Sequence, residues 1–311
     1  MSTTAFIFPG QASQYVGMGQ DFYESSPRVK LLYDRASEIL GYDLPEVSFH
    51  GPLEKLTETM HTQPAILVHS LAILAELGNP ESEVAFAAGH SLGEYSALAC
   101  AGVLSSEDAI AAVRERSRLM QSACDAEDGT MAALIGCEGE NLENLIKTAT
   151  QAGIVQPANF NSPGQVAISG SRAGVEKAIE IAKEFGAKKA IPLQVGGAFH
   201  SPLMASAQQQ LGQVLEKMTF NPARFPIVTN VRAEGSSEPA VLKQLLVDQI
   251  TWPVLWRQSI EYMIKNKVEK FVEIGPGKVL SGLVKRISRD VEIINIDTLA
   301  DLEKYKEGVQ I

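Results

Sequence analysis

The segment from Val84 to Ala101 constrains the fold of this chain more than any other stretch. It opens with a short apolar run typical of a buried strand and closes with small, apolar residues typical of a packed helix. Between them lies Gly89-His90-Ser91-Leu92-Gly93, a G-x-S-x-G match that places a serine on a tight strand-to-helix turn. We therefore interpret Ser91 as a nucleophile. The alternative is a plain glycine-rich turn with a capping serine.

The remaining chain alternates predicted strands with predicted helices, which indicates a parallel sheet covered on both faces. Beside the strand that opens at Val84, we expect strands at 4–8, 227–230, 271–274 and 291–296, and helices at 28–40, 63–77, 105–124, 202–218, 239–250, 253–265 and 278–287.

From Gly129 the order of elements changes to strand, helix, strand, strand, helix, strand, which fits a ferredoxin-like unit. These elements are expected at 130–135, 140–149, 154–158, 165–169, 174–185 and 189–195. The predicted fold is thus α/β: a parallel-sheet, α/β-hydrolase-like large domain (1–127 and 197–311) with an inserted ferredoxin-like small domain (128–196).

Charge and cysteine usage exclude several classes of protein. The formal net charge is -10 without a lysine- or arginine-rich run, which argues against nucleic-acid binding. No apolar stretch is long enough for a membrane span, and no basic segment precedes an apolar run at the amino terminus. Cys100, Cys124 and Cys137 form no C-x-x-C pair, so we expect reduced, mostly buried thiols and a cytoplasmic protein. No histidine spacing suggests a metal site.

A serine hydroxyl needs a base to remove its proton as it attacks. His200 follows paired glycines at a predicted strand-to-helix junction, where side chains commonly project into a cleft. His90 is adjacent to Ser91 and should point away from it. His200 is therefore the candidate base, and the alternative is a capping or buried histidine.

The tetrahedral intermediate of such a reaction carries an oxyanion that needs two backbone donors. The N–H of Leu92 directly follows the nucleophile. The N–H of Gln11 is the first free donor after the break at Pro9-Gly10, because proline has no N–H. We expect these two groups to form the oxyanion hole.

Arginines 114, 116 and 118 lie on the predicted helix 105–124, and at 100° per residue they do not share a face. One of them can point inward, or all three are surface residues. An inward guanidinium would bind a carboxylate through two parallel hydrogen bonds, which suggests an acyl group that ends in a carboxylate. A hydrolase of this type would end with its histidine near the carboxyl terminus, but more than a hundred residues follow His200.

Short motifs spread along the chain carry a further signal: Phe8-Pro9-Gly10-Gln11, Gln63-Pro64-Ala65, Gly89-His90-Ser91-Leu92-Gly93-Glu94-Tyr95, Arg116 with Met120-Gln121, Asn159-Phe160-Asn161-Ser162-Pro163-Gly164-Gln165, Ala198-Phe199-His200-Ser201-Pro202-Leu203-Met204, Gln249 with Thr251-Trp252-Pro253-Val254, and Glu273-Ile274-Gly275-Pro276-Gly277. Together these motifs resemble the malonyl-CoA:acyl carrier protein transacylase family over essentially the whole chain. Ser117 stands where family members often have glycine, a small change that should not disturb Arg116.

The resemblance implies that malonyl-CoA acylates Ser91 and that His200 is the general base. Gln249 would support His200 through its backbone carbonyl, which explains the absence of an acidic partner. Arg116 would hold the free malonyl carboxylate.

The resemblance also implies the oxyanion hole of Gln11 and Leu92. Gln63, Asn159 and Phe199 would bind substrate, and Phe199 resembles the malonyl-selective form of its motif.

By the same resemblance, the reaction is ping-pong, without a metal or redox cofactor, and it feeds fatty acid biosynthesis or a polyketide route. The expected partners are malonyl-CoA and an acidic acyl carrier protein, for which Lys188, Lys189, Lys285 and Arg286 are candidate contacts or ordinary surface. We expect a monomer. The alternatives from other classes are a serine hydrolase and a non-catalytic carrier-binding protein.

Overall fold

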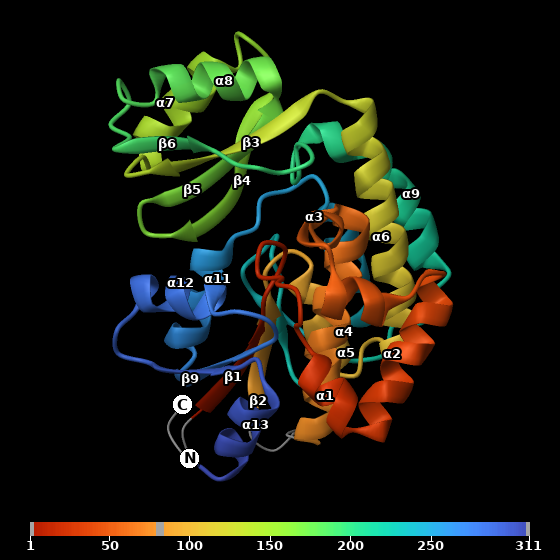
Figure 1. Cartoon of the computed structure of the whole chain (residues 1–311). Coiled ribbons are helices and arrows are strands. Elements are labelled where there is room, and N and C mark those ends of the chain that lie inside the picture. Colours follow the sequence, from red (N-terminus) through yellow and green to blue (C-terminus); the bar gives the residue numbers. More distant parts are fainter. Residues whose placement is uncertain (1–2, 79–83, 309–311) are drawn as a thin grey trace.

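The computed structural model describes residues 3–78 and 84–308, which form two β-sheets with helices packed against them (Figure 1). The larger sheet has the strand order β10-β9-β1-β2-β7-β8. Its strands are β1 (Thr3–Phe8), β2 (Val84–Gly89), β7 (Ile227–Val228), β8 (Gly235–Ser236), β9 (Val268–Ile274) and β10 (Glu292–Ile296). All neighbouring pairs are parallel except β7 and β8, which are antiparallel.

Strand β1 lies in the middle of this sheet and is buried on both faces. Phe6 and Phe8 point into one apolar core, whereas Ala5 and Ile7 point into another. Successive side chains of a strand face opposite sides, so the apolar run from Ala5 to Phe8 needs helices on both faces of the sheet. Full burial of each large apolar side chain contributes roughly 1.5–3 kcal/mol.

Two layers of helices cover the larger sheet (Figure 1). One face packs against α11 (Trp256–Lys265) and α12 (Val279–Ile287). The other face packs against the larger group: α1 (Gln20–Ser25), α2 (Pro27–Leu40), α3 (Leu53–Thr57), α4 (Thr59–Leu77), α5 (Gly93–Cys100), α6 (Ser106–Ala126), α9 (Ala205–Glu216), α10 (Pro239–Asp248) and α13 (Leu299–Lys306).

The second sheet is formed by the segment predicted to be ferredoxin-like. Its strands are β3 (Gly129–Ile135), β4 (Val155–Ser162), β5 (Gln165–Ser171) and β6 (Lys189–Pro192), in the order β4-β5-β3-β6 with every pair antiparallel. Helices α7 (Gly139–Ala149) and α8 (Arg172–Ile181) cover the face that lies away from the larger sheet (Figure 1). The predicted α/β fold class, a parallel sheet with an inserted small unit, is confirmed.

One face of the small sheet packs against helices, and the other face lines a cavity. Alternate residues such as Ala132 and Ile168 pack under α7 and α8. Their neighbours Met131 and Ala167 face the opposite way and line a cavity that also contacts the large sheet's loops. The period-2 pattern of these strands thus places one wall of the cavity.

A short backbone ladder joins the two parts of the molecule. The Phe160 N–H donates to the Val254 carbonyl at 2.9 Å, and the Val254 N–H donates to the Ala158 carbonyl at 2.8 Å. Asn159 and Val254 form an isolated parallel bridge. This ladder fixes the position of Asn159 relative to the segment that follows α10.

The same ladder explains one wrong boundary. We expected a helix from Pro253, but Val254 is held in the bridge, so α11 begins at Trp256. The helix predicted from Pro202 is also different. Pro202 opens a 3₁₀ turn, η2 (Pro202–Met204), and α9 begins only at Ala205.

Other boundaries differ by several residues. Helix α8 ends at Ile181 rather than at residue 185, and the chain turns at Gly186 with φ of 83°. Strand β6 ends at Pro192, three residues before the predicted end. Helix α4 begins at Thr59, so that Pro64 lies inside it. The short helices α1, α3 and α13 and the π-helical turn η1 (Glu46–His50) were not predicted.

The three cysteines are unpaired and buried, as expected. Over the described part of the chain, no helix combines the length and apolar character needed to cross a bilayer.

Candidate active site

Ser91 lies on the turn between β2 and α5, in a backbone conformation with φ of 51° that non-glycine residues rarely adopt. The two glycines of the motif leave room for this turn. A Cβ on Gly89 would lie 1.8 Å from the Gly93 carbonyl carbon, and a Cβ on Gly93 would lie 2.1 Å from the Phe8 carbonyl oxygen. The turn therefore requires glycine at both positions for reasons of space.

Hydrogen bonds from two buried side chains, Asn230 and Gln249, hold this turn in place. The Asn230 side chain accepts from the Ser91 N–H at 2.7 Å and donates to the Gly89 carbonyl at 2.6 Å. The Gln249 Nε2 donates to the Ser91 carbonyl at 3.0 Å. The turn is thus bonded on both sides of the serine.

Glu94 completes this set of contacts. Its Oε2 accepts from the Asn230 backbone N–H at 3.1 Å and from the Gln249 Nε2 at 2.9 Å. Burial raises the pKa of Glu94 to about 7, although the two hydrogen bonds and the charge of Arg116 oppose that rise. We did not single out Glu94 or Asn230 from the sequence; an acid within an otherwise small and apolar helix was the available signal.

His200 meets Ser91 from the other side. Its Nε2 lies 2.9 Å from the Ser91 Oγ, and its Nδ1 lies 2.7 Å from the backbone carbonyl oxygen of Gln249. Because a carbonyl accepts hydrogen bonds only, Nδ1 carries the proton and Nε2 presents a lone pair to the serine. His200 also has a positive φ, 57°, which aims its ring at the serine from a short loop.

The imidazole of His200 is neutral. Burial, helped by the nearby positive charge of Arg116, lowers its pKa to about 3. The hydrogen bond to the Gln249 carbonyl opposes this shift but does not outweigh it. A neutral imidazole is the form that accepts a proton.

Arg116 is the inward arginine of α6, and only 1% of its surface is exposed; Arg114 and Arg118 are solvent-exposed. Its Nη1 donates to the Gln63 Oε1 at 2.7 Å, and its Nη2 donates to the Gln249 Oε1 at 2.9 Å. The Nη2 also donates to the Ser91 Oγ at 2.9 Å. No carboxylate forms a salt bridge with it among the described residues. A buried cation without an anionic partner is suited to an anionic ligand.

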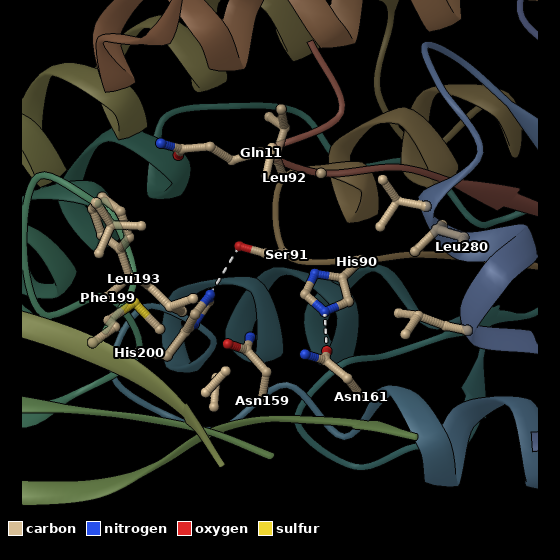
Figure 2. Close-up of a pocket in the computed structure, with 18 of the residues that line it drawn as sticks. Gln11, His90, Ser91, Leu92, Asn159, Asn161, Leu193, Phe199, His200 and Leu280 are labelled. Carbon is tan, nitrogen blue, oxygen red and sulfur yellow. Dashed lines mark hydrogen bonds between the residues drawn. The ribbon is translucent and has the colours of Figure 1, made fainter. Parts of the chain in front are cut away.

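His90 does not bond to Ser91. Its Nε2 lies 2.8 Å from the Asn161 Oδ1, and its ring packs against Trp256 with centroids 5.6 Å apart. Burial lowers the pKa of His90, so this ring is also neutral. Figure 2 shows the ring turned towards Asn161 and away from the serine hydroxyl.

A cavity of about 260 Å³ opens above these residues, between the small sheet and the loops of the large one (Figure 2). The side chains predicted to act on substrate line it, namely Gln63, Ser91, Arg116, Asn159, Phe199 and His200. Gln249 does not line the cavity; it lies behind Arg116 and His200 and is hydrogen-bonded to both. Several apolar lining residues were not predicted, among them Leu193 and Leu280.

The candidate oxyanion donors lie at this cavity too. Gln11 and Leu92 both line it, and neither backbone N–H bonds to any part of the chain that the structure describes. Gly10 is needed for space rather than for an unusual φ, since a Cβ there would lie 2.4 Å from the His90 carbonyl oxygen. The residue with φ of 80° in this loop is Ala12.

The candidate cationic residues are all exposed. Lys285 and Arg286 lie on α12, and the Arg286 Nη1 donates to the Gln165 Oε1 at 2.6 Å. Gln165 lines the cavity, so this end of α12 lies at its rim. Lys188 and Lys189 lie at the start of β6. Among residues 3–78 and 84–308, no three or more histidine, cysteine, aspartate or glutamate side chains lie close enough together to hold a metal ion.

The site thus combines a hydroxyl, a neutral imidazole and a buried guanidinium around one cavity. The hydroxyl and imidazole suit nucleophilic acyl transfer, and the guanidinium suits an acyl group with a free carboxylate.

Comparison with known proteins agrees with this chemistry. A family model described as an acyl transferase domain matches residues 5–308. A malonyl CoA-acyl carrier protein transacylase from Bacillus subtilis strain 168 is 46% identical over 304 residues, which cover 97% of this chain and 96% of that protein.

Solved structures give the same result. An acyl carrier protein S-malonyltransferase from Vibrio cholerae O1 biovar eltor strain N16961 superposes with a TM-score of 0.92 at 43% identity, covering 98% of this chain and 100% of that one. A malonyl-transacylase in complex with its type II PKS acyl-carrier protein superposes with a TM-score of 0.93 at 41% identity, covering 99% and 100%.

Proposed function

This chain belongs to the acyl transferase family that contains the malonyl CoA-acyl carrier protein transacylases, and from this membership we propose that it transfers malonyl from malonyl-CoA to an acyl carrier protein. The acceptor is the phosphopantetheine thiol of the carrier. The observation that carries the proposal is that the His200 Nε2 and the Arg116 Nη2 each lie 2.9 Å from the Ser91 Oγ.

In the first half-reaction, the Ser91 Oγ attacks the thioester carbonyl carbon and its proton passes to the His200 Nε2. The negative oxygen of the tetrahedral intermediate lies between the N–H groups of Gln11 and Leu92. Loss of one such donor costs roughly 10²–10³ in rate. The intermediate then expels CoA, which takes the proton from His200, and malonyl remains as an ester on Ser91.

In the second half-reaction, the carrier thiol replaces CoA and the steps run in reverse. His200 takes the thiol proton, sulfur attacks the malonyl ester, and Ser91 recovers its proton as the ester bond breaks. The Gln249 carbonyl, 2.7 Å from the His200 Nδ1, keeps the imidazole in the correct tautomer and stabilises the imidazolium that forms transiently.

Arg116 selects the acyl group. Two charge-assisted hydrogen bonds from one guanidinium to the malonyl carboxylate contribute about 1.5–3 kcal/mol each. Gln63 orients the guanidinium through its Oε1. Asn159 and Phe199 bound the cavity beside His200 and contact the substrate there.

The carrier docks at the rim of the cavity near α12, where Lys285 and Arg286 are exposed. Carrier proteins of this type are acidic, so complementary charge would speed their association. The product would feed fatty acid biosynthesis. Every side chain in this proposal comes from one chain, so one copy is sufficient for activity.

The test is the mass of the intact protein after brief exposure to malonyl-CoA alone. We expect one malonyl adduct on the wild type and none on Ser91→Ala. Addition of a phosphopantetheinylated carrier should then move the adduct to the carrier. Release of the adduct as free malonate instead would identify a hydrolase, and an adduct on Ser91→Ala would refute the assignment of the nucleophile.

A further inference from the structure

The hydrogen bonds of Arg116 leave few of its donors for a ligand. Both hydrogens of Nη2 are used, one by the Gln249 Oε1 and one by the Ser91 Oγ, each at 2.9 Å. One hydrogen of Nη1 is used by the Gln63 Oε1. Within the described chain, the buried Nε has no partner. The free hydrogens are therefore that of Nε and one on Nη1.

A guanidinium can grip a carboxylate through two parallel N–H bonds along only two of its edges. One edge pairs Nη1 with Nη2, and the other pairs Nε with Nη2, because Nη1 lies on the side of Cδ. Both edges include Nη2. A carboxylate that binds Arg116 through two bonds must therefore displace an acceptor that Nη2 already holds.

Of the two acceptors, the serine is the one that can yield. The Gln249 side chain is fully buried, and its Nε2 is held by the Ser91 carbonyl and by Glu94. The Ser91 Oγ faces the cavity and has a second partner in His200, so it stays hydrogen-bonded when it loses Arg116.

We infer that the carboxylate of the acyl group switches on the nucleophile by displacing the Ser91 Oγ from Arg116. This inference rests on the proposed function and deepens it. Before substrate binds, a lone pair of Oγ is engaged by a cation, which weakens it for attack. Once the carboxylate occupies Nη2, Oγ keeps its bond to His200 alone. No covalent bond changes in this step.

The switch has a consequence for selectivity. An acyl-CoA without a carboxylate, such as acetyl-CoA, meets a serine that is still bound to Arg116. It therefore lacks both the binding contacts and the activation. The neutralised guanidinium would also no longer depress the basicity of His200, since its charge is one of the causes of that depression.

A carboxylate supplied separately tests the switch. The probe is an uncharged sulfonyl fluoride. The Ser91 Oγ forms a bond to its sulfur, fluoride leaves, and the serine proton passes to His200. We expect sodium formate to raise the labelling rate of the wild type about tenfold and saturably, relative to sodium chloride at equal ionic strength. A second arm uses acetyl-CoA with and without formate and follows the acetyl adduct by intact mass.

Arg116→Met provides the matched control, because it keeps the length of the side chain and removes the donors. We expect it to react with the sulfonyl fluoride about as fast without formate as the wild type does with it, and to ignore formate. The switch would be overturned if formate slowed the labelling of the wild type or left its rate unchanged. It would also be overturned if the wild type were not labelled at all. An equal rise in the variant would do the same.

The wild-type arm alone decides the question if the variant does not fold. Neither probe involves malonyl-CoA or a carrier. Failure of the switch therefore leaves malonyl adduct formation intact, whereas failure of the proposed function would abolish that adduct.

Discussion

Glu94→Gln should change how the free energy of unfolding depends on pH. Glu94 is fully buried, and its pKa rises from 4.5 to about 7 in the folded protein. A group whose pKa is raised on folding stabilises the protein below its unfolded pKa, and that contribution is lost as pH rises through the folded pKa. Glutamine has the shape of the protonated acid and does not titrate.

The magnitude follows from the interval between the pKa of Glu94 in the unfolded chain and its pKa in the folded protein. A difference of one bound proton changes the free energy of unfolding by about 1.4 kcal/mol per pH unit. Across the range from 4.5 to about 7, the variant should gain about 3 kcal/mol relative to the wild type. The variant should therefore be similar to the wild type at low pH and more stable above neutrality.

The variant must be compared with the wild type at each pH, because His200 changes the free energy of unfolding in the opposite direction. Its pKa is lowered from 6.5 to about 3, so the unfolded chain binds more protons in that range and stability falls as pH drops. Between 4.5 and 6.5 the two groups oppose each other. The wild-type curve alone would therefore hide the contribution of Glu94.

The assay is urea unfolding followed by tryptophan fluorescence at several pH values between 4.5 and 8, since Trp256 is fully buried between α11 and the larger sheet. Ser96→Ala is the control, because Ser96 is a buried, non-titrating residue of the same helix. Its difference from the wild type should not vary with pH. A Glu94→Gln difference that is equally flat would refute the assignment of a raised pKa.

Four further substitutions test the site and its supports. For Arg116→Ala, the ratio of kcat/KM for malonyl-CoA to that for acetyl-CoA should fall about 10²- to 10⁴-fold, and an unchanged ratio would mean that this side chain does not recognise the carboxylate. Gly93→Ala should destabilise by more than about 3 kcal/mol in urea titrations, because its Cβ would lie 2.1 Å from the Phe8 carbonyl oxygen. Gly282→Ala should instead stabilise by about 0.5–1 kcal/mol, since this exposed helical position has no described atom within 4 Å of the added Cβ. Lys285→Glu should reduce kcat/KM for the carrier about tenfold at low salt, and a loss that persists at high salt would argue against an electrostatic contact.

Local patterns were sufficient for the turn around Ser91. The apolar run, the two glycines and the small residues that follow are contiguous, and each has a local steric reason. The order of strands and helices was likewise readable from periodicity. It predicted both sheets, including the inserted one, but missed the short edge strand β8.

Contacts between distant residues were not readable in this way. Asn230 donates to Glu94 across 136 residues, and neither position belongs to a pattern that points to the other. The start of α11 is set by the bridge between Asn159 and Val254 rather than by the proline that usually opens a helix. Such features depend on tertiary contacts that override local preference.

The ladder between residues 158–160 and Val254 has a consequence for how this site could acquire new substrates. Main-chain hydrogen bonds do not depend on side-chain identity, so substitutions other than proline in this region keep the bonds that set the spacing between the two halves. A bulkier acyl chain therefore gains room by trimming a wall residue such as Phe199, which lines the cavity. The backbone ladder thus keeps the width of the cavity constant, whereas the side chains that line the cavity can change.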